Sequence, residues 1–271
     1  MNIPRIAVCV KPVPDPAYYD KITVDRTTKR LQRGQAPTIM NELDRHALEK
    51  ALQLKEALQA EITVFSMAPA NSRLVLLEAL ALGSDKVVLL NDINFAGADT
   101  LATAYTLARG ITHSGTFDII LMGSESSVGG TEQVAAQLGE LLGIPRFTHV
   151  ISVSLDFDSG RFEVAAKHDS GVNRYRVNGP VLCGVTREIA TPRLPTLRNI
   201  RHCTEKPLIT LDAKAIEADP QRIGDAGSPT KAGAIYNRES TRQGIMLQGT
   251  PDAITDRILT EMRRLGVLSQ A

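Results

Sequence analysis

Residues Asp118-Ile-Ile-Leu-Met-Gly-Ser-Glu-Ser-Ser-Val-Gly-Gly-Thr-Glu-Gln-Val134 join an apolar run to a loop rich in serine and glycine. The run 118–122 is the most apolar strand pattern in the chain, which is typical of a strand buried on both faces. A helix is predicted from about Thr131 to Leu142, where Gly143 and Pro145 end it. A strand, a loop and a helix in this order predict a parallel α/β sheet with a ligand site at the loop.

Strand and helix patterns alternate through the first two-thirds of the chain. Strands are predicted at 6–10, 62–66, 86–90 and 118–122, and helices at 41–58 (with Asn41 as N-cap), 74–82 and 99–109. This alternation predicts an α/β fold, a Rossmann-like parallel sheet with flanking helices. Ligands of such sheets bind beyond the carboxyl ends of the strands, so the loops that follow the four strands form the expected site.

The pattern changes after residue 147. Two strands of a hairpin are predicted at 150–155 and 161–167, then strands at 173–177 and 181–185. Residues 219–230 have little to bury, which predicts a segment that is disordered or laid against a partner. A final helix is predicted after Thr250, with Pro251 at its first position.

Composition excludes several classes of function. The formal net charge is +1, aromatic residues make up 4% of the chain and tryptophan is absent, so nucleic-acid binding is not expected. Cys9, Cys183 and Cys203 lie far apart, which excludes a disulfide framework and a zinc site and fits the cytoplasm. The chain shows neither a signal-peptide pattern nor an apolar run long enough for membrane insertion.

The loop after residue 122 carries the features of a phosphate site. Gly129 and Gly130 allow a sharp turn and close approach of a ligand. The following helix presents free N–H groups that suit phosphate. Hydroxyl donors come from Ser124, Ser126, Ser127 and Thr131. The other interpretation is a plain Ser/Gly-rich turn capped by Thr131.

The sequence offers no catalytic constellation and no metal site. The five histidines lack ligand spacing, no G-x-S-x-G elbow is present, and Cys9 fits a buried strand better than a nucleophile. Glu49, Gln53 and Glu56 are interpreted as the solvated side of a helix. A nucleotide site without such groups indicates binding, or redox chemistry carried out by a cofactor.

Residues Thr191-Pro-Arg-Leu-Pro-Thr-Leu-Arg-Asn-Ile200 follow the last predicted strand. Two prolines stiffen this loop, and Leu197 is offered as an apolar side chain between basic residues. The pattern is typical of a docking loop, and the alternative is a linker with an incidental leucine.

Taken together, these pieces resemble the electron transfer flavoprotein beta subunits along nearly the whole chain. The stretches that carry the resemblance are Val8–Asp15, Asn41–Glu56, Ser66–Ala70, Ala79–Asp85, the spacing from Gly123 through Gln133 to Pro145, and the loop from Pro192-Arg193 to Leu197.

The resemblance implies a heterodimer in which an alpha subunit holds the transferring FAD. The beta subunit would hold a second nucleotide, AMP or a second FAD, and act as an electron carrier without catalytic residues. Its domains would be 1–190 for the nucleotide, 191–200 for partner recognition with Leu197 as anchor, and a C-terminal arm and helix, 201–271, packed on the alpha subunit. The nucleotide contacts implied are Cys9, Asn41, Glu42, Leu43, Asp44, Met67, Gly123, Ser124, Ser126, Ser127, Val128, Gly129, Gly130, Thr131, Gln133 and Val134.

Redox partners implied by the family are a flavin dehydrogenase, such as an acyl-CoA type, or a membrane quinone oxidoreductase. The stretches Phe95–Thr100 and Gly227–Thr230 resemble the nitrogen-fixation-associated, bifurcating branch, which would add NADH and ferredoxin. Val128 and Ala135 depart from that branch, where most relatives have Asp and Gly, so the second nucleotide stays open between AMP and FAD.

Two other functions remain open at this point. A stand-alone adenine-nucleotide-binding protein of the universal-stress type would share the fold and the phosphate loop, but would not need the 191–200 loop or the polar arm. An ATP-dependent ligase is the third hypothesis, and it lacks a catalytic lysine and a metal-binding motif.

Overall fold

The computed structural model describes residues 3–21, 23–25, 30–32, 37–156, 159–231 and 244–268. These fall into two compact units, 1–233 and 234–271, which are described separately.

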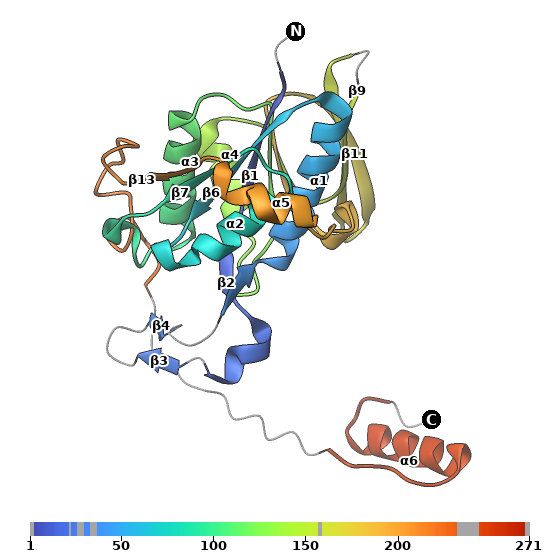
Figure 1. The fold of residues 1–271 in the computed structure, drawn as a ribbon. Helices are drawn as coiled ribbons and strands as arrows, with labels where there is room; N and C mark the ends of the chain where they lie inside the picture. Colours follow the sequence, from blue (N-terminus) through green and yellow to red (C-terminus); the bar gives the residue numbers. More distant parts are fainter. Residues whose placement is uncertain are drawn as a thin grey trace. The chain divides into compact units, whose positions relative to one another are not determined.

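The first unit is built on a sheet whose nine described strands lie in the order β11-β10-β9-β12-β8-β1-β6-β7-β13 (Figure 1). The parallel part runs from β9 to β13, and β10 and β11 extend it as antiparallel strands. The strands are β1 (Arg5–Cys9), β6 (Glu61–Met67), β7 (Lys86–Leu90), β8 (Ile119–Gly123), β9 (Arg146–Asp156), β10 (Arg161–His168), β11 (Gly171–Asn178), β12 (Val181–Val185) and β13 (Leu208–Leu211). The predicted Rossmann-like α/β class is confirmed.

Helices cover both faces of this sheet. The helices α1 (Glu42–Leu58) and α2 (Arg73–Leu82) bury apolar residues against one face, together with Ile6 and Val8. The helices α3 (Thr100–His113) and α4 (Val134–Leu142) pack on the other face with Ala7. Successive β1 residues therefore enter opposite cores, as expected for a strand that is buried on both sides.

Short elements complete the first unit. They are two small two-stranded sheets, β2 (Pro12–Pro14) with β5 (Thr38–Met40) and β3 (Thr23–Asp25) with β4 (Arg30–Gln32), and the helix α5 (Leu197–His202).

The order of the strands locates the ligand edge. From β1 the chain continues outward to β6 and β7, then returns to β8 on the other side of β1. The direction of winding therefore reverses between β1 and β8, and a crevice opens at the carboxyl ends of such a pair. The 123–134 loop leaves β8 at this point.

Two element boundaries differ from the sequence prediction for physical reasons. The helix α4 begins at Val134 rather than near Thr131, because Gly129, Gly130 and Glu132 have positive φ and cannot continue a helix. The strand β9 begins at Arg146 rather than 150, because its first residues pair with β12.

The prediction that residues 219–230 have little to bury is wrong. Residues 208–211 add β13 to the sheet beside β7, and Ile216 and Ile223, exposed by 0% and 3%, join the core against α3. Ser228 is also buried, and its hydroxyl accepts a hydrogen bond from Asp99 N at 2.8 Å. The segment therefore packs on its own domain, and contact of 201–271 with an alpha subunit stays a prediction.

The second unit contains α6 (Pro251–Arg264), with the predicted Thr250 cap and Pro251 at the first turn. The Thr250 hydroxyl accepts a hydrogen bond from Ala253 N at 3.4 Å. None of the described α6 residues is buried within the chain, and Ile258 remains 44% exposed.

Replacing Ile216 tests the packing of the 212–231 segment. Ile216→Ala is expected to lower the free energy of unfolding by about 2–5 kcal/mol, because it opens a cavity in the core. The matched control is Ile245→Ala, since Ile245 is 65% exposed, and it should change stability by less than ~0.5 kcal/mol. Urea unfolding of the isolated chain measures both values, and equal effects would contradict this packing.

Candidate functional site

A cleft with a volume of about 510 Å³ lies at the carboxyl edge of the sheet, between the start of α1, the loop after β8 and the turn after β12. Seven of the predicted nucleotide contacts line it: Asn41, Glu42, Leu43, Ser124, Ser126, Ser127 and Gly130. The cleft thus brings together two sequence segments that lie about eighty residues apart.

The Asp44 carboxylate ties the elements around the cleft together. One of its oxygens accepts a hydrogen bond from Lys11 N at 2.8 Å and the other from Gly123 N at 2.9 Å. These bonds link α1 to the chain just after β1 and to the end of β8. Gly123 is required here, because a Cβ would lie 2.7 Å from both the Asp44 carboxylate and Leu43. Asp44 is 5% exposed, and burial raises its pKa to about 6, against the lowering effect of these hydrogen bonds.

Asn41 holds the loop rather than the helix. It occupies the predicted N-cap position of α1, yet its side chain makes no capping bond. The amide instead donates to Glu125 O at 2.9 Å and accepts from Ser127 N at 3.1 Å. The loop thereby gains two of the backbone partners that an isolated loop would lack.

Lys11 braces the same loop from the β1 side, a role that the sequence analysis did not assign. Its ammonium donates to the Ser126 hydroxyl and to the Val128 carbonyl, each at 2.8 Å. The contact with Val128 uses its backbone carbonyl and not its side chain. It is therefore not lost because Val stands where most relatives have Asp. The available signal for Lys11 was its place in the stretch Val8–Asp15, which carries part of the family resemblance.

The end of the loop leads into α4 without the expected cap. Gln133 is the N-cap residue, it forms no side-chain capping bond, and Thr131 is exposed. The interpretation as a turn capped by Thr131 is therefore wrong. The Gln133 side chain accepts a hydrogen bond from the Thr100 hydroxyl at 3.0 Å, which joins the starts of α3 and α4. The first N–H groups of α4 have no partner within the helix and suit an anion.

Cys9 and Met67 do not line the cleft. Cys9 is 4% exposed in the core beneath α3 and α4, and burial raises the pKa of its thiol, so it does not act as a nucleophile. Met67 is half-buried at the end of β6 and packs against the same core. Val128, Gly129, Thr131, Gln133 and Val134 also lie outside the lining. Nucleotide contact by these residues stays a prediction.

His149 and Glu132 meet at the cleft, and the sequence analysis found neither. Both have positive φ, +54° and +58°, and the His149 Nε2 lies 3.2 Å from the Glu132 carboxylate. The register of β9 shifts against β12 at this point, which directs His149 into the cleft, and its N–H donates to the Ser124 hydroxyl at 3.2 Å. Strained residues of this kind gather at binding sites.

The side chains around the cleft are predominantly acidic. Glu42, Glu125, Glu132 and Glu188 line it, whereas Arg187 and His149 are its basic residues. Both basic groups face carboxylates, since Arg187 lies 3.6 Å from Glu42. Carboxylates suit hydroxyl and amine donors, so a phosphate group would have to bind the backbone N–H groups of the loop and α4.

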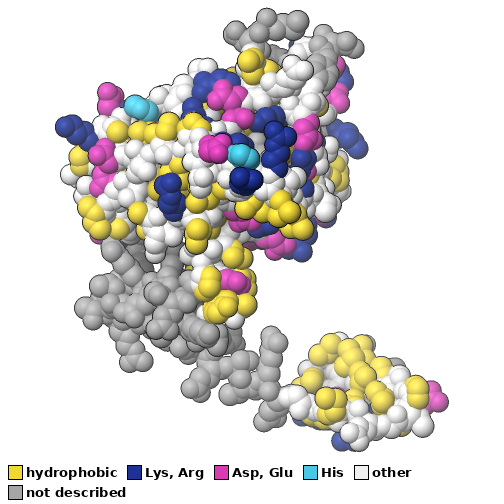
Figure 2. All heavy atoms as spheres, in the orientation of Figure 1, with side chains coloured by type: hydrophobic (Ala, Val, Ile, Leu, Met, Phe, Trp, Pro, Cys, Tyr) yellow, Lys and Arg dark blue, Asp and Glu magenta, His cyan; other side chains and the backbone are white. Residues whose placement is uncertain are grey.

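The predicted docking loop has an exposed apolar edge. Leu194 and Leu197 are 81% and 86% exposed, and α5 starts at Leu197 after a cap by Thr196. Figure 2 shows hydrophobic, basic and acidic side chains mixed on the face that carries α2 and α5 in Figure 1. Exposed leucines on a rigid edge are suited to contact another protein.

The family model described as electron transfer flavoprotein domain matches residues 28–216. The chain belongs to the electron transfer flavoprotein family. This confirms the resemblance found in the sequence and gives no support to the stand-alone universal-stress hypothesis.

Relatives of this electron transfer flavoprotein chain match it along most of its length. It is 36% identical over 268 residues to the electron transfer flavoprotein subunit beta of Megasphaera elsdenii, covering 95% of this chain and 97% of the relative. It is 32% identical to the caffeyl-CoA reductase-Etf complex subunit CarD of Acetobacterium woodii, covering 91% and 92%. Protein FixA of Azorhizobium caulinodans is 31% identical, with 95% and 93% covered. Among the described residues, no helix is long and apolar enough to span a membrane.

The buried Asp44 predicts a pH-dependent stability. Its pKa rises from 3.8 to about 6 on folding. As the pH rises between these values, the unfolded chain releases the proton before the folded chain does, so the free energy of unfolding of wild type falls by up to ~3 kcal/mol. Asp44→Asn cannot titrate and loses one N–H partner. We expect this variant to have a lower free energy of unfolding than wild type at pH 4. The difference between the two should become smaller toward pH 7.

Urea unfolding at several pH values measures that difference. The control is Leu48→Ala, in the core face of the same helix. It also destabilises the chain, but its difference from wild type in the free energy of unfolding should not follow the titration of Asp44. A difference for Asp44→Asn that stays constant or widens toward pH 7 would contradict the assignment.

Proposed function

We propose that this chain works as the beta subunit of an electron transfer flavoprotein and forms an FAD-containing heterodimer with an alpha subunit. The observation that carries the proposal is the 123–134 loop, braced by Lys11 and Asn41 at the switch point of the sheet. A braced loop at that position, in a chain related to beta subunits along nearly its full length, suits a nucleotide held for structure or redox work.

We propose one orientation for a nucleotide in this site. Its phosphate would meet the backbone N–H groups of the loop and the first turn of α4, where the helix dipole favours negative charge. Its ribose hydroxyls would face the carboxylates of the cleft, such as Glu125. The chain's own residues bind and orient the nucleotide, and a bound flavin would supply the redox chemistry.

The nature of the second nucleotide separates two kinds of carrier. AMP would make the heterodimer a one-flavin carrier between dehydrogenases and acceptors. A second FAD would make it a candidate for electron bifurcation from NADH to ferredoxin. The stretches 95–100 and 227–230 resemble the bifurcating branch and favour the second hypothesis, whereas Val128 and Ala135 depart from that branch.

The test is the nucleotide content of the complex co-expressed with its alpha subunit. After denaturation, FAD and AMP are quantified per heterodimer. Two FAD and no AMP would support the bifurcating type, whereas one FAD and one AMP would indicate the simple carrier. A complex that releases no adenine nucleotide besides the FAD of the alpha subunit would contradict a nucleotide site in this chain.

We further propose that the 191–200 loop docks the redox partner, a flavin dehydrogenase of the acyl-CoA type or a membrane quinone oxidoreductase, with Leu197 as anchor. One apolar side chain buried at the centre of a small interface can dominate its affinity. Leu197 is exposed by 86% and is held on the first turn of α5, so it is available to fill a pocket on another protein.

Leu197→Ala is expected to raise the KM for the heterodimer about tenfold or more, because the loss of a hot-spot side chain costs about 2 kcal/mol. Nucleotide content should stay unchanged. Stopped-flow reduction of the complex by an acyl-CoA dehydrogenase of the same organism measures this, with Val172→Ala on the exposed edge strand β11 as control. Partner kinetics unaltered by Leu197→Ala would remove the docking role.

A further inference from the structure

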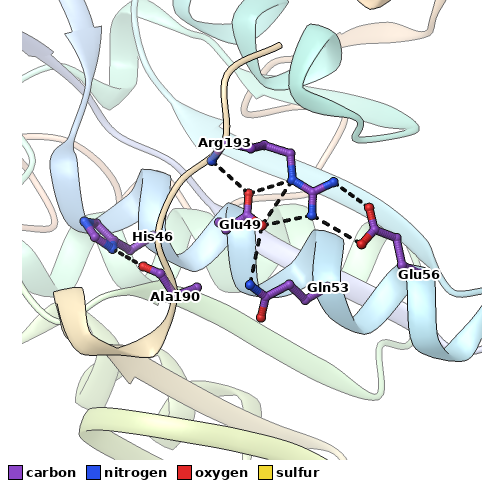
Figure 3. Close-up of polar contacts among 6 residues, drawn as sticks. All are labelled: His46, Glu49, Gln53, Glu56, Ala190 and Arg193. Atoms are coloured by element: carbon purple, nitrogen blue, oxygen red, sulfur yellow. Dashed lines mark hydrogen bonds and ion pairs between the residues drawn. The ribbon is translucent and has the colours of Figure 1, made fainter. Parts of the chain in front are cut away.

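Arg193 is fastened to α1 by an extensive set of hydrogen bonds. Its guanidinium Nε lies 2.8 Å from Glu49 Oε2, its Nη2 lies 2.9 Å from Glu49 Oε1, and its backbone N–H donates to Glu49 Oε2 at 3.1 Å (Figure 3). The other side of the guanidinium bonds to Glu56 through Nη1 and Nη2. The fork of arginine suits such paired carboxylates, and lysine cannot reproduce it.

Glu49 is a buried residue, so the interpretation of this helix face as solvated is wrong for Glu49, whereas Gln53 and Glu56 are exposed. Its side chain is 6% exposed, and that of Glu56 is 61% exposed. Hydrogen bonds from Arg193 hold the pKa of Glu56 below its usual range. A buried carboxylate is costly unless it is paired, so Glu49 needs a cation at this place.

A second attachment lies three residues earlier on α1. The His46 ring Nδ1 lies 2.6 Å from Ala190 O. His46, Glu49, Gln53 and Glu56 recur at helical spacing (Figure 3). Three of them contact the 190–193 segment, and the Gln53 amide donates to Glu49 at 3.5 Å. One face of α1 therefore holds this segment through side-chain contacts.

The segment has few other means of support. Among the described residues, no backbone-to-backbone hydrogen bond involves 191–195, and Pro192 and Pro195 have no N–H to donate. Leu194 and Leu197, which both follow Arg193 in the chain, point to solvent and are more than 80% exposed. The Arg193 side chain and the Glu49 carboxylate thus replace the missing backbone ladder.

We propose that Arg193 is a positioning residue: its clamp on Glu49 and Glu56 holds the 191–202 segment in one conformation and presents Leu194 and Leu197 together to a partner. Ordering a free loop on binding costs affinity, and a loop that is already ordered avoids that cost. The clamp itself is a property of this chain, whereas its effect on a partner rests on the proposed function.

Hydrogen exchange of the heterodimer tests the clamp without any partner. The variant Arg193→Met combined with Glu49→Gln removes the clamp without leaving a buried unpaired charge. Within peptides covering 191–202, the amide of Arg193 and the amides of α5 are expected to exchange about tenfold faster or more, because local opening would no longer break a charged network. Peptides of β1 and β8 should be unchanged, which excludes general unfolding.

Two further variants sharpen this test. Arg198→Met removes an equal charge from exposed α5 and should leave the exchange of the Arg193 amide as in wild type. The single variant Arg193→Lys should keep more protection from exchange than the double variant but less than wild type. A lysine ammonium retains the charge but cannot form the paired bonds of the guanidinium to the two carboxylates. Unchanged exchange of 191–202 in the double variant would overturn the clamp.

Partner kinetics then test what the clamp is for. With the same acyl-CoA dehydrogenase, the double variant should show a raised KM for the heterodimer and an unchanged kcat, since the flavin environment is not altered. Faster exchange with an unchanged KM would overturn the presentation of the segment to a partner. If Leu197→Ala also left the kinetics unchanged, the proposed docking function would fail while the exchange result stood.

Discussion

The arrangement of the cleft depends on one buried carboxylate, Asp44. Its two oxygens receive the N–H groups of Lys11 and Gly123, at the ends of the two strands between which the sheet reverses its winding. Parallel strands have no hydrogen-bond partners for the N–H groups just beyond their ends, and such groups are costly when buried. A carboxylate from the first turn of α1 satisfies both at once, and so fixes where the helix starts relative to the sheet.

The loop that follows Gly123 inherits this geometry. Asn41 and Lys11, on either side of the Asp44 contact, supply its remaining partners. Much of the loop's polar capacity is therefore satisfied by the chain itself, which leaves the N–H groups before α4 for an anion and the acidic lining for hydroxyls. This separation of backbone N–H groups from acidic side chains is consistent with the proposed nucleotide, whose phosphate would bind the backbone and whose sugar would bind the side chains.

The fold was predictable from the sequence because strands such as 86–90 are short apolar runs bounded by turn-forming residues, and they alternate with longer amphipathic helix patterns. The location of the cleft was predictable for the same reason, since the loop that follows the strand 118–122 contributes to its lining. The places of Glu132 and His149 in the cleft were not predictable, because both depend on positive φ values and that of His149 also on a β-bulge, and neither feature has a periodic signal. Ile216 and Ile223 were missed because they lie in irregular chain, where burial leaves no spacing to detect.

The helix α1 carries two buried acids, Asp44 and Glu49, five residues apart. Burial of a carboxylate is unfavourable by itself, and well-packed apolar residues at buried positions often give a more stable fold. Each acid instead holds a segment that lacks backbone pairing, the strand ends and loop at the cleft in one case and the 190–195 segment in the other. Because both attachments belong to one helix, the positions of the cleft and of the exposed leucines depend on the same element, which would suit the proposed placing of a cofactor and a partner relative to each other.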